Sequence, residues 1–246
     1  MKSGFLALAL TLSLFAQTRQ AFEAVSIHEN PGPWRKMVDY SASGSRLMLG
    51  GWRIGDLIQE AYGLKPYQVI LPPETINAVF DIAAKADGDA ERSKAEFRPL
   101  LQTMLEERFH LKFHREQREI PVYAMVIGKG GPKFQQSDPD QPAKSLGGVY
   151  GRNQSVEFQQ GTMEDLAHRI PMALFTDRPV INHTGLTGKY TVKLVATPEF
   201  RINNNPQPDD IRVFDAIQQQ LGLKLEPRKE SMEVLVVDHV EIPSGN

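Results

Sequence analysis

The second half of this chain repeats the pattern of its first half at a nearly constant offset. Residues 47–57 align without a gap with residues 156–166, and residues 80–82 then align with residues 190–192. The third block is the longest, and its positions correspond one for one: Leu101, Leu105, Phe109, Leu111, Lys112, Phe113, Val122 and Ala124 with Val213, Ile217, Leu221, Leu223, Lys224, Leu225, Val234 and Val236. Three blocks in the same order predict a duplicated structural unit.

The first 16 residues have the three parts of a secretory signal peptide. Lys2 supplies a positive charge, an apolar run from Phe5 to Phe15 follows, and the small residue Ala16 comes next. The run is shorter than the roughly 20 residues that a membrane-spanning helix needs. The sequence therefore predicts an exported protein, periplasmic or secreted, with no membrane span after signal removal.

The composition excludes several kinds of chemistry. The chain has no cysteine, so disulfide bonds, a thiol nucleophile and zinc sites of the cysteine type are ruled out. The formal net charge is −2, and acidic and basic residues are interspersed. This leaves no positive stripe for a phosphate backbone, and we do not expect nucleic acid as a partner.

The first repeat is expected over residues 17–134, and its apolar spacing predicts alternating strands and helices. The elements in order are a strand at 47–49, a helix over 54–61 that stops at Gly63, strands at 67–70 and 79–83, a helix from about Pro99, and strands at 111–114 and 122–127. Proline suits the first turn of a helix, and glycine suits the position after its end.

The second repeat is expected over residues 153–246 with the same order of elements. They are a strand near Val156, a helix from Thr162, strands at 179–181 and 190–195, a helix over 210–221, and strands at 223–225 and 233–240. Residues 135–152 are rich in Pro, Gly, Asp and Ser and are interpreted as a linker, and residues 201–209 as a polar loop. Short turns between strands favour antiparallel or mixed sheets with helices on one face, an α+β fold built from a duplicated β-α-β-β-α-β-β unit.

Seven motifs in this order resemble the hallmarks of a soil-associated bacterial family of exported proteins of unknown function. They are residues 22–27 (FEAVSI), 107–116 (ERFHLKFHRE), 121–124 (PVYA), 130–133 (GGPK), 178–180 (RPV), 184–190 (TGLTGKY) and 220–225 (QLGLKL). The chain departs from the family at Asn182, where aspartate is usual, and around residues 70–77, where a tryptophan usually precedes the Phe-Asp-Ile strand. No function is therefore carried over to those positions.

Each repeat is also similar, more loosely, to the short N-terminal domain of secretins and TonB-dependent receptors, a small periplasmic module that docks other proteins. This likeness is at the level of the fold. Some relatives in the soil-associated family carry the module behind an antirepressor-type membrane metallopeptidase. That resemblance implies a sensor role.

A metal site is conceivable at His110 and His114, because Glu116 and Glu119 lie close by and imidazole and carboxylate are usual zinc ligands. The repeat argues against it. His110 aligns with Gly222, where a glycine would end a helix, so we expect His110 in a left-handed position between helix and strand. No metal and no cofactor is predicted.

An acid–base pair is conceivable where Asp165 and His168 lie one turn apart, or where Asp238 adjoins His239. Asp165 aligns with Asp56, however, which indicates that this carboxylate serves a helix start in both repeats. No Gly-x-Ser-x-Gly motif accompanies either histidine. A hydrolase or sensor domain acting on an envelope glycan or peptide stays as the alternative, and no residue is assigned as catalytic.

The favoured function is a non-enzymatic module that binds an envelope protein or peptide. Two open repeats leave edge strands, which natural proteins must cover or use, and the segment from residue 233 to 240 is the preferred edge. The candidate interaction residues are Arg108, Lys112, Arg115, Val234 and Val236. The alternative for the basic residues is an ordinary solvated strand face.

Overall fold

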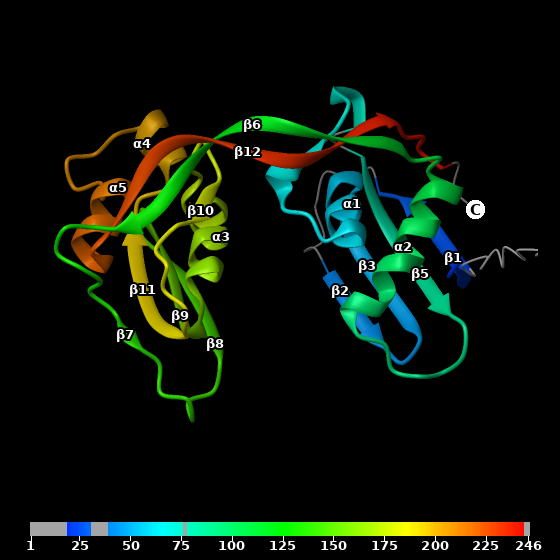
Figure 1. The fold of residues 1–246 in the computed structure, drawn as a ribbon, viewed down its shortest axis with the longest axis horizontal. Helices are drawn as coiled ribbons and strands as arrows, with labels where there is room; N and C mark the ends of the chain where they lie inside the picture. Colours follow the sequence, from blue (N-terminus) through cyan, green and yellow to red (C-terminus); the bar gives the residue numbers. More distant parts are fainter. Residues whose placement is uncertain (1–18, 31–38, 76–77, 244–246) are drawn as a thin grey trace, which may run out of the picture. The chain divides into compact units, whose positions relative to one another are not determined.

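The computed structural model describes residues 19–30, 39–75 and 78–243 (Figure 1). The predicted signal segment lies outside these residues. The chain forms two compact units: unit 1 comprises residues 1–116 and 234–246, and unit 2 comprises residues 117–233. The helices and sheets of both units confirm the predicted α+β class. No helix in the described part of the chain combines the length and apolar character that crossing a bilayer requires.

Unit 1 is built on a four-stranded antiparallel sheet in the order β1-β5-β3-β2. Its strands are β1 (Phe22–Glu29), β2 (Asp39–Ser43), β3 (Arg46–Arg53) and β5 (Val79–Ala86). Helices α1 (Ile54–Tyr62) and α2 (Lys94–Arg108) pack on it, and two 3-10 turns (Pro66–Gln68 and Pro73–Thr75) flank the short strand β4 (Val69–Ile70). β5 alternates half-buried and buried side chains along its length, which is the pattern of a strand with one face on a core.

Unit 2 contains a sheet with the corresponding order, β7-β11-β9-β8, again antiparallel throughout. Its strands are β7 (Gln135–Gln136), β8 (Lys144–Tyr150), β9 (Asn153–Gly161) and β11 (Tyr190–Ala196), with β10 (Val180–Asn182) outside this sheet. The helices are α3 (Met163–Leu174), α4 (Glu199–Asn204) and α5 (Val213–Ala216), and α5 continues into a π-helical turn (Ile217–Leu221).

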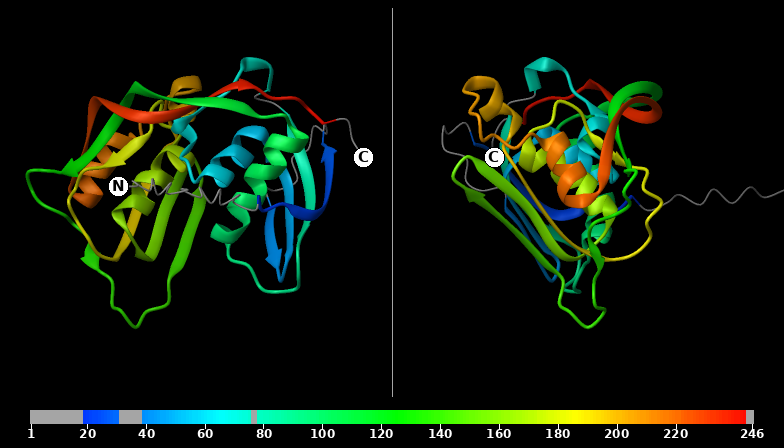
Figure 2. Two further views of the ribbon diagram at one scale, coloured as in Figure 1. Left: turned by 45° about the vertical axis from the view of Figure 1, so that its right-hand side comes forward. Right: turned by 90° about the vertical axis from the view of Figure 1, so that its left-hand side faces the viewer.

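Two long strands each contribute to both units. β6 (Lys112–Ile127) begins in unit 1 and ends in unit 2, whereas β12 (Leu223–His239) begins in unit 2 and ends in unit 1. They are neighbours in a third sheet of order β10-β6-β12-β4, in which β10 pairs parallel with β6 and β4 pairs parallel with β12 (Figures 1 and 2). The sequence predicts two separate strands at each place, and the structure has one continuous strand.

The two cores show the consequence of this exchange. The core of unit 1 includes Leu235 and Val237 from the end of β12, beside Phe80 and Phe109, whose rings meet edge to face at 5.0 Å. The core of unit 2 includes Met125 from the end of β6. Each unit is therefore completed by a strand that starts in the other half of the chain.

Aligned positions of the two repeats share unusual backbone conformations. Gly51 and Gln160 both have positive φ at a bulge, in β3 and β9 respectively, and His110 and Gly222 both have positive φ after a helix. The left-handed position predicted for His110 is confirmed. These matches and the corresponding strand orders agree with the predicted duplication, and a common origin of the two halves stays a prediction.

Several local predictions differ from the structure. α2 begins at Lys94, five residues before Pro99, because Ser93 caps it and reciprocates with Glu96. Residues 135–152 do not form a linker, since β7 and β8 belong to the sheet of unit 2. Of the strand predicted over residues 67–70, the structure confirms residues 69–70 as β4, and residues 67–68 belong to a 3-10 turn. The loop predicted over 201–209 includes part of α4.

Candidate functional site

In the part of the chain that the structure describes, no strand pairs with the outer edge of β8. β8 pairs with β9 along its whole length, from Lys144 opposite Gln159 to Tyr150 opposite Asn153, and it is the last strand of its sheet. Three of its seven residues are large apolar side chains with high exposed fractions: Leu146 at 46%, Val149 at 62% and Tyr150 at 57%. An exposed apolar edge strand is a template for pairing with another chain unless something blunts it.

The corresponding edge strand of unit 1, β2, is more polar. β2 holds the place in its sheet that β8 holds in unit 2. It has one large apolar side chain, that of Tyr40, which is half-buried; the other residues are Asp39, Ser41, Ala42 and Ser43. β8 carries no proline, and its single charged residue, Lys144, lies at one end. β2 likewise lacks proline and has one charged residue, Asp39, at an end, so the exposed apolar side chains are what distinguish β8 as a pairing edge.

The two faces of β8 are fixed by its register with β9. Ser145 lies opposite Phe158 and Gly147 lies opposite Val156, and both partners belong to the core that includes α3. Ser145, Gly147 and Val149 therefore lie on the α3 face, and Lys144, Leu146 and Tyr150 lie on the other face.

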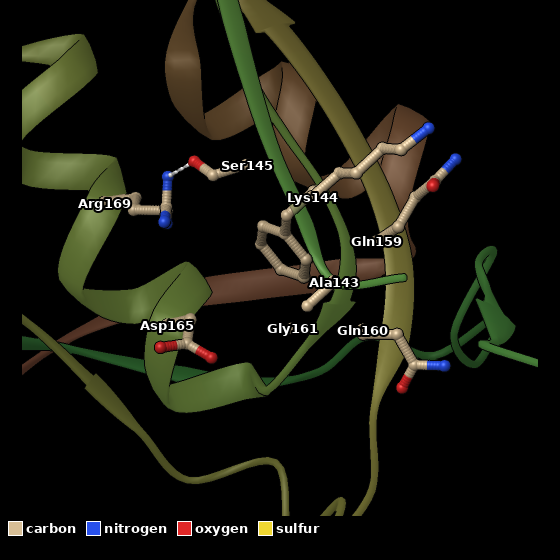
Figure 3. A pocket seen from close by; sticks show the side chains of 9 residues that line it. Ala143, Lys144, Ser145, Gln159, Gln160, Gly161, Asp165 and Arg169 are labelled. Carbon is tan, nitrogen blue, oxygen red and sulfur yellow. Dashed lines mark hydrogen bonds between the residues drawn. The ribbon is translucent and has the colours of Figure 1, made fainter. Parts of the chain in front are cut away.

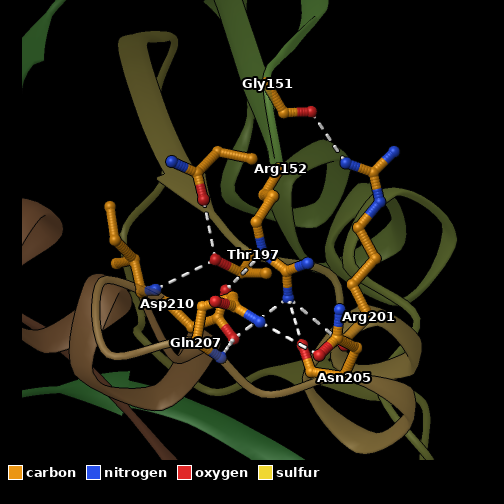
Figure 4. A network of polar contacts seen from close by, with 9 residues as sticks. Gly151, Arg152, Thr197, Arg201, Asn205, Gln207 and Asp210 are labelled. Atoms are coloured by element: carbon orange, nitrogen blue, oxygen red, sulfur yellow. Dashed lines mark hydrogen bonds and ion pairs between the residues drawn. The ribbon is translucent and has the colours of Figure 1, made fainter.

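A polar network secures the turn between β8 and β9 (Figure 4). Arg152 donates two hydrogen bonds to the carboxylate of Asp210, from Nε to Oδ1 at 2.9 Å and from Nη2 to Oδ2 at 3.2 Å, and a third from Nη2 to the Asn205 carbonyl at 2.6 Å. Arg201 donates to the carbonyl of Gly151 at 2.9 Å. Donation from Arg152 holds the pKa of Asp210 below its usual range. The network ties one end of β8 to the loop around α4.

A pocket of about 240 Å³ lies at the other end of β8. It is lined by residues of β8, β9, α3 and the segment before β8: Ala143, Lys144, Ser145, Phe158, Gln159, Gln160, Gly161, Asp165 and Arg169. Figure 3 shows Ser145 and Arg169 directed toward one another, whereas Lys144 and Gln159 point away from α3. The pocket is thus a recess between the start of β8 and the first turns of α3.

The floor of this pocket depends on a close approach at Gly161. A Cβ atom at this position would lie 2.2 Å from the Phe158 ring, so only glycine leaves the ring its place. Gln160 precedes it with a φ of 60°, which turns the chain from β9 toward α3.

Arg169 is the main charged group of the pocket. Its Nη1 donates to Ser145 Oγ at 2.6 Å, and its guanidinium lies 6.0 Å from the centre of the Phe158 ring. Among the residues that the structure describes, Ser145 is the one hydrogen-bond acceptor found for this side chain, and a guanidinium has five N–H donors. The remaining donors can bind an anionic ligand.

Asp165 also lines the pocket, and its oxygens serve the start of α3. Its Oδ2 accepts from the Thr162 amide at 2.8 Å and from Thr162 Oγ1 at 2.7 Å, and Thr162 Oγ1 accepts in turn from the Asp165 amide at 3.1 Å. This reciprocal cap confirms the predicted role of Asp165 at a helix start. Asp56 makes the equivalent contact with the Arg53 amide at 3.2 Å in unit 1.

A second pocket of unit 2, of about 340 Å³, is lined by Lys129, Lys133 and Lys224 together with Gln218 and three glycines. Lys133 donates to the Gln219 carbonyl at 3.0 Å, and Lys224 pairs with Glu226 at 3.1 Å. Lys133 thus satisfies a carbonyl near the end of a helix, and Lys224 neutralises Glu226, so two of the three lysines have a structural role.

The residues predicted as an interaction surface all lie in unit 1. Arg108 is in the last turn of α2, and Lys112 and Arg115 are exposed on the first part of β6. The expectation of an open edge over residues 233–240 is wrong, because β12 has β6 on one side and β4 on the other, with Val236 opposite Ile70. Val234 is fully buried, so its side chain cannot contact a partner.

Histidines pair with carboxylates at the surface. His114 Nδ1 lies 2.8 Å from Asp238, His183 Nε2 lies 2.7 Å from Glu230, and His239 Nε2 lies 2.8 Å from Glu241. None of these three histidines lines the two pockets above. In the described ranges, no group of three or more His, Asp and Glu side chains is arranged to hold a metal ion.

No curated protein matches this chain, and no solved structure matches it. The model of one protein family, described as a protein of unknown function (DUF3738), matches residues 55–240. This match covers all of unit 2, part of unit 1 and the two strands that the units exchange, and the chain therefore belongs to the DUF3738 family.

Proposed function

We propose that this chain is an exported binding module that captures an extended segment of a partner protein by adding it as a strand to β8. The observation that carries the proposal is the open edge of β8 with its exposed Leu146, Val149 and Tyr150. In this mode, main-chain hydrogen bonds to the edge supply affinity and the side chains on its two faces supply selectivity. Export to the periplasm or the medium rests on the predicted signal segment.

The contacts that hold β8 in place support this assignment. The Arg152–Asp210 network holds the turn after β8, and β9 pairs with the inner side of β8 over all seven residues. The strand is therefore already ordered before a partner binds. A preformed strand loses little conformational entropy when a partner pairs with it. Apolar contacts of the added strand with Leu146 and Tyr150 on one face and Val149 on the other would then favour binding.

The alternative, a hydrolase or sensor acting on an envelope glycan or peptide, has less support. A hydrolase needs a nucleophile or an activated water beside its acid–base pair in a recess. The pairs His114–Asp238, His183–Glu230 and His239–Glu241 are exposed and lie outside the two pockets. A sensor that works by capturing a peptide is compatible with the β8 proposal.

The test is a binding screen of random octapeptides against the chain from residue 17 onward. Leu146→Lys places a charge on the edge without disturbing a buried contact, and we expect it to weaken the captured peptides at least tenfold, a loss of about 1.4 kcal/mol. Ala42→Lys, on the corresponding edge of unit 1, is the matched control and should leave binding unchanged. Equal binding by both variants, or no captured peptide at all, would show that β8 is not the binding edge.

A further inference from the structure

We propose that the pocket at the start of β8 binds the C-terminal carboxylate of the captured segment, with Arg169 as its ligand. This proposal rests on the proposed function, because the pocket would bind the C-terminal end of the strand that pairs with β8. The partners would then be proteins that end in a free, extended C-terminal tail.

The direction of the sheet selects which end of the segment reaches the pocket. β8 runs from Lys144 to Tyr150, and all three pairs in its sheet are antiparallel. Antiparallel addition continues this pattern and is somewhat more stable per residue than parallel pairing. The added strand then ends beside Ala143, Lys144 and Ser145, and these are the residues of β8 and its approach that line the pocket.

The chemistry of Arg169 suits a carboxylate. A guanidinium presents N–H groups in a planar fork that matches the two oxygens of a carboxylate, and such charge-assisted pairs are stronger than neutral hydrogen bonds. Ser145 Oγ, at 2.6 Å, and the Phe158 ring, at 6.0 Å, hold the fork in place. Ser145 lies on β8 itself, so its hydrogen bond connects the pairing edge to Arg169, the residue that would bind the carboxylate.

The charge of Asp165 limits how strong this site can be. Its carboxylate lines the same pocket, and its Oδ2 accepts hydrogen bonds from Thr162 at the helix start. Lys144 adds a positive charge at the rim although its side chain points away from α3 (Figure 3). The pocket therefore carries one more positive than negative side chain, which favours a singly charged group such as a C-terminal carboxylate.

The experiment compares two octapeptide libraries of the same random composition, one with free C-terminal carboxylates and one with amidated C-termini. Both are screened against the chain from residue 17 onward, and dissociation constants are measured for the selected sequences in both forms. We expect the free acids to bind about tenfold more tightly or better, the effect of hydrogen bonds to a charged group.

Arg169→Gln should abolish the preference for the free acid and leave the weaker binding of the amidated peptides unchanged. Arg169→Lys, which keeps the positive charge, should retain part of the preference for the free acid. Arg178→Gln is the matched control, because Arg178 also lies over an aromatic ring, Tyr123 at 5.3 Å, but in another part of unit 2. It should keep the full preference. Thermal unfolding of each variant verifies that the fold persists.

The outcomes separate the two proposals. Equal binding of acids and amides that still depends on Leu146 would overturn the carboxylate site and leave strand capture standing. Selection of an internal Asp or Glu regardless of amidation would overturn the C-terminal assignment. Loss of all peptide binding from both libraries, or binding that Leu146→Lys does not weaken, would overturn the proposed function itself.

Discussion

Tyr62 is half-buried, and its hydroxyl oxygen is enclosed by the protein. It ends α1, and its ring meets that of Phe113 edge to face at 4.9 Å. Within the described residues, its hydroxyl has no hydrogen-bond partner. Burial, and then the charge of Glu106, raise the pKa of Tyr62 to about 12. The hydroxyl therefore costs stability in its neutral form and more when it ionises.

Replacing this residue should reveal both effects. Tyr62→Phe removes the unpaired hydroxyl, and we expect the free energy of unfolding at pH 7 to stay level or to rise by up to about 1 kcal/mol. The unfolded tyrosine releases its proton near pH 10, whereas the folded one retains it until about pH 12, so the wild-type chain loses stability as pH rises between these values. Urea unfolding from pH 7 to 11.5 should show the advantage of Tyr62→Phe widening above pH 10. Tyr150→Phe, at an exposed position, is the control, and a gap that stays constant for Tyr62→Phe would contradict the burial of this group.

At the scale of elements, the parts predicted correctly are those with local signals. Gly63, with a φ of 65°, follows the end of α1, and Asp165 serves the start of α3, as the sequence predicts. The reciprocal cap with Thr162 is how Asp165 does so. The bond partners of a cap lie within three or four residues, so they can be read from a short stretch of sequence. The predicted start of α2 near Pro99 is wrong because the Ser93–Glu96 capping pair, which is equally local, begins the helix five residues earlier and leaves Pro99 inside it.

The element that carries the candidate site was missed for a different reason. Gly147 and Gly148 interrupt the alternation of β8, and prolines and aspartates precede it, so the segment has the composition of a loop. Only the pairing with β9, which begins nine residues after Lys144, makes it a strand. Leu146, Val149 and Tyr150 were the available signal, because a solvated linker seldom carries three large apolar residues in five positions.

At the scale of the whole molecule, the exchange of β6 and β12 could not be deduced from the sequence. The strand-like residues 122–127 and 233–240 were recognised, but the repeat pattern is the same whether each strand folds back on its own unit or enters the other. In the structure, Leu235 is buried in the core of unit 1 and Met125 in the core of unit 2. The stability of unit 1 thus depends on residues that follow unit 2 in the sequence, and the stability of unit 2 depends on the end of a strand that begins in unit 1.

This exchange predicts crossed effects of two core substitutions. Leu235→Ala should cost about 2–5 kcal/mol and deprotect the amides of α1 and β5, while those of α3 and β11 keep their protection. Met125→Ala should do the reverse. Hydrogen exchange followed by mass spectrometry distinguishes the two patterns. Deprotection of α3 by Leu235→Ala, with α1 unaffected, would mean that β12 completes its own unit.

The measurement that tests the central claim most directly is hydrogen exchange of the chain from residue 17 onward, alone and saturated with a peptide selected by the octapeptide screen. Pairing with an added strand places outward amides of β8 in hydrogen bonds, so the account predicts slower exchange over residues 144–150 and unchanged exchange over β2, residues 39–43. Unchanged exchange along β8, with protection appearing elsewhere, would contradict the assignment of this strand as the binding edge.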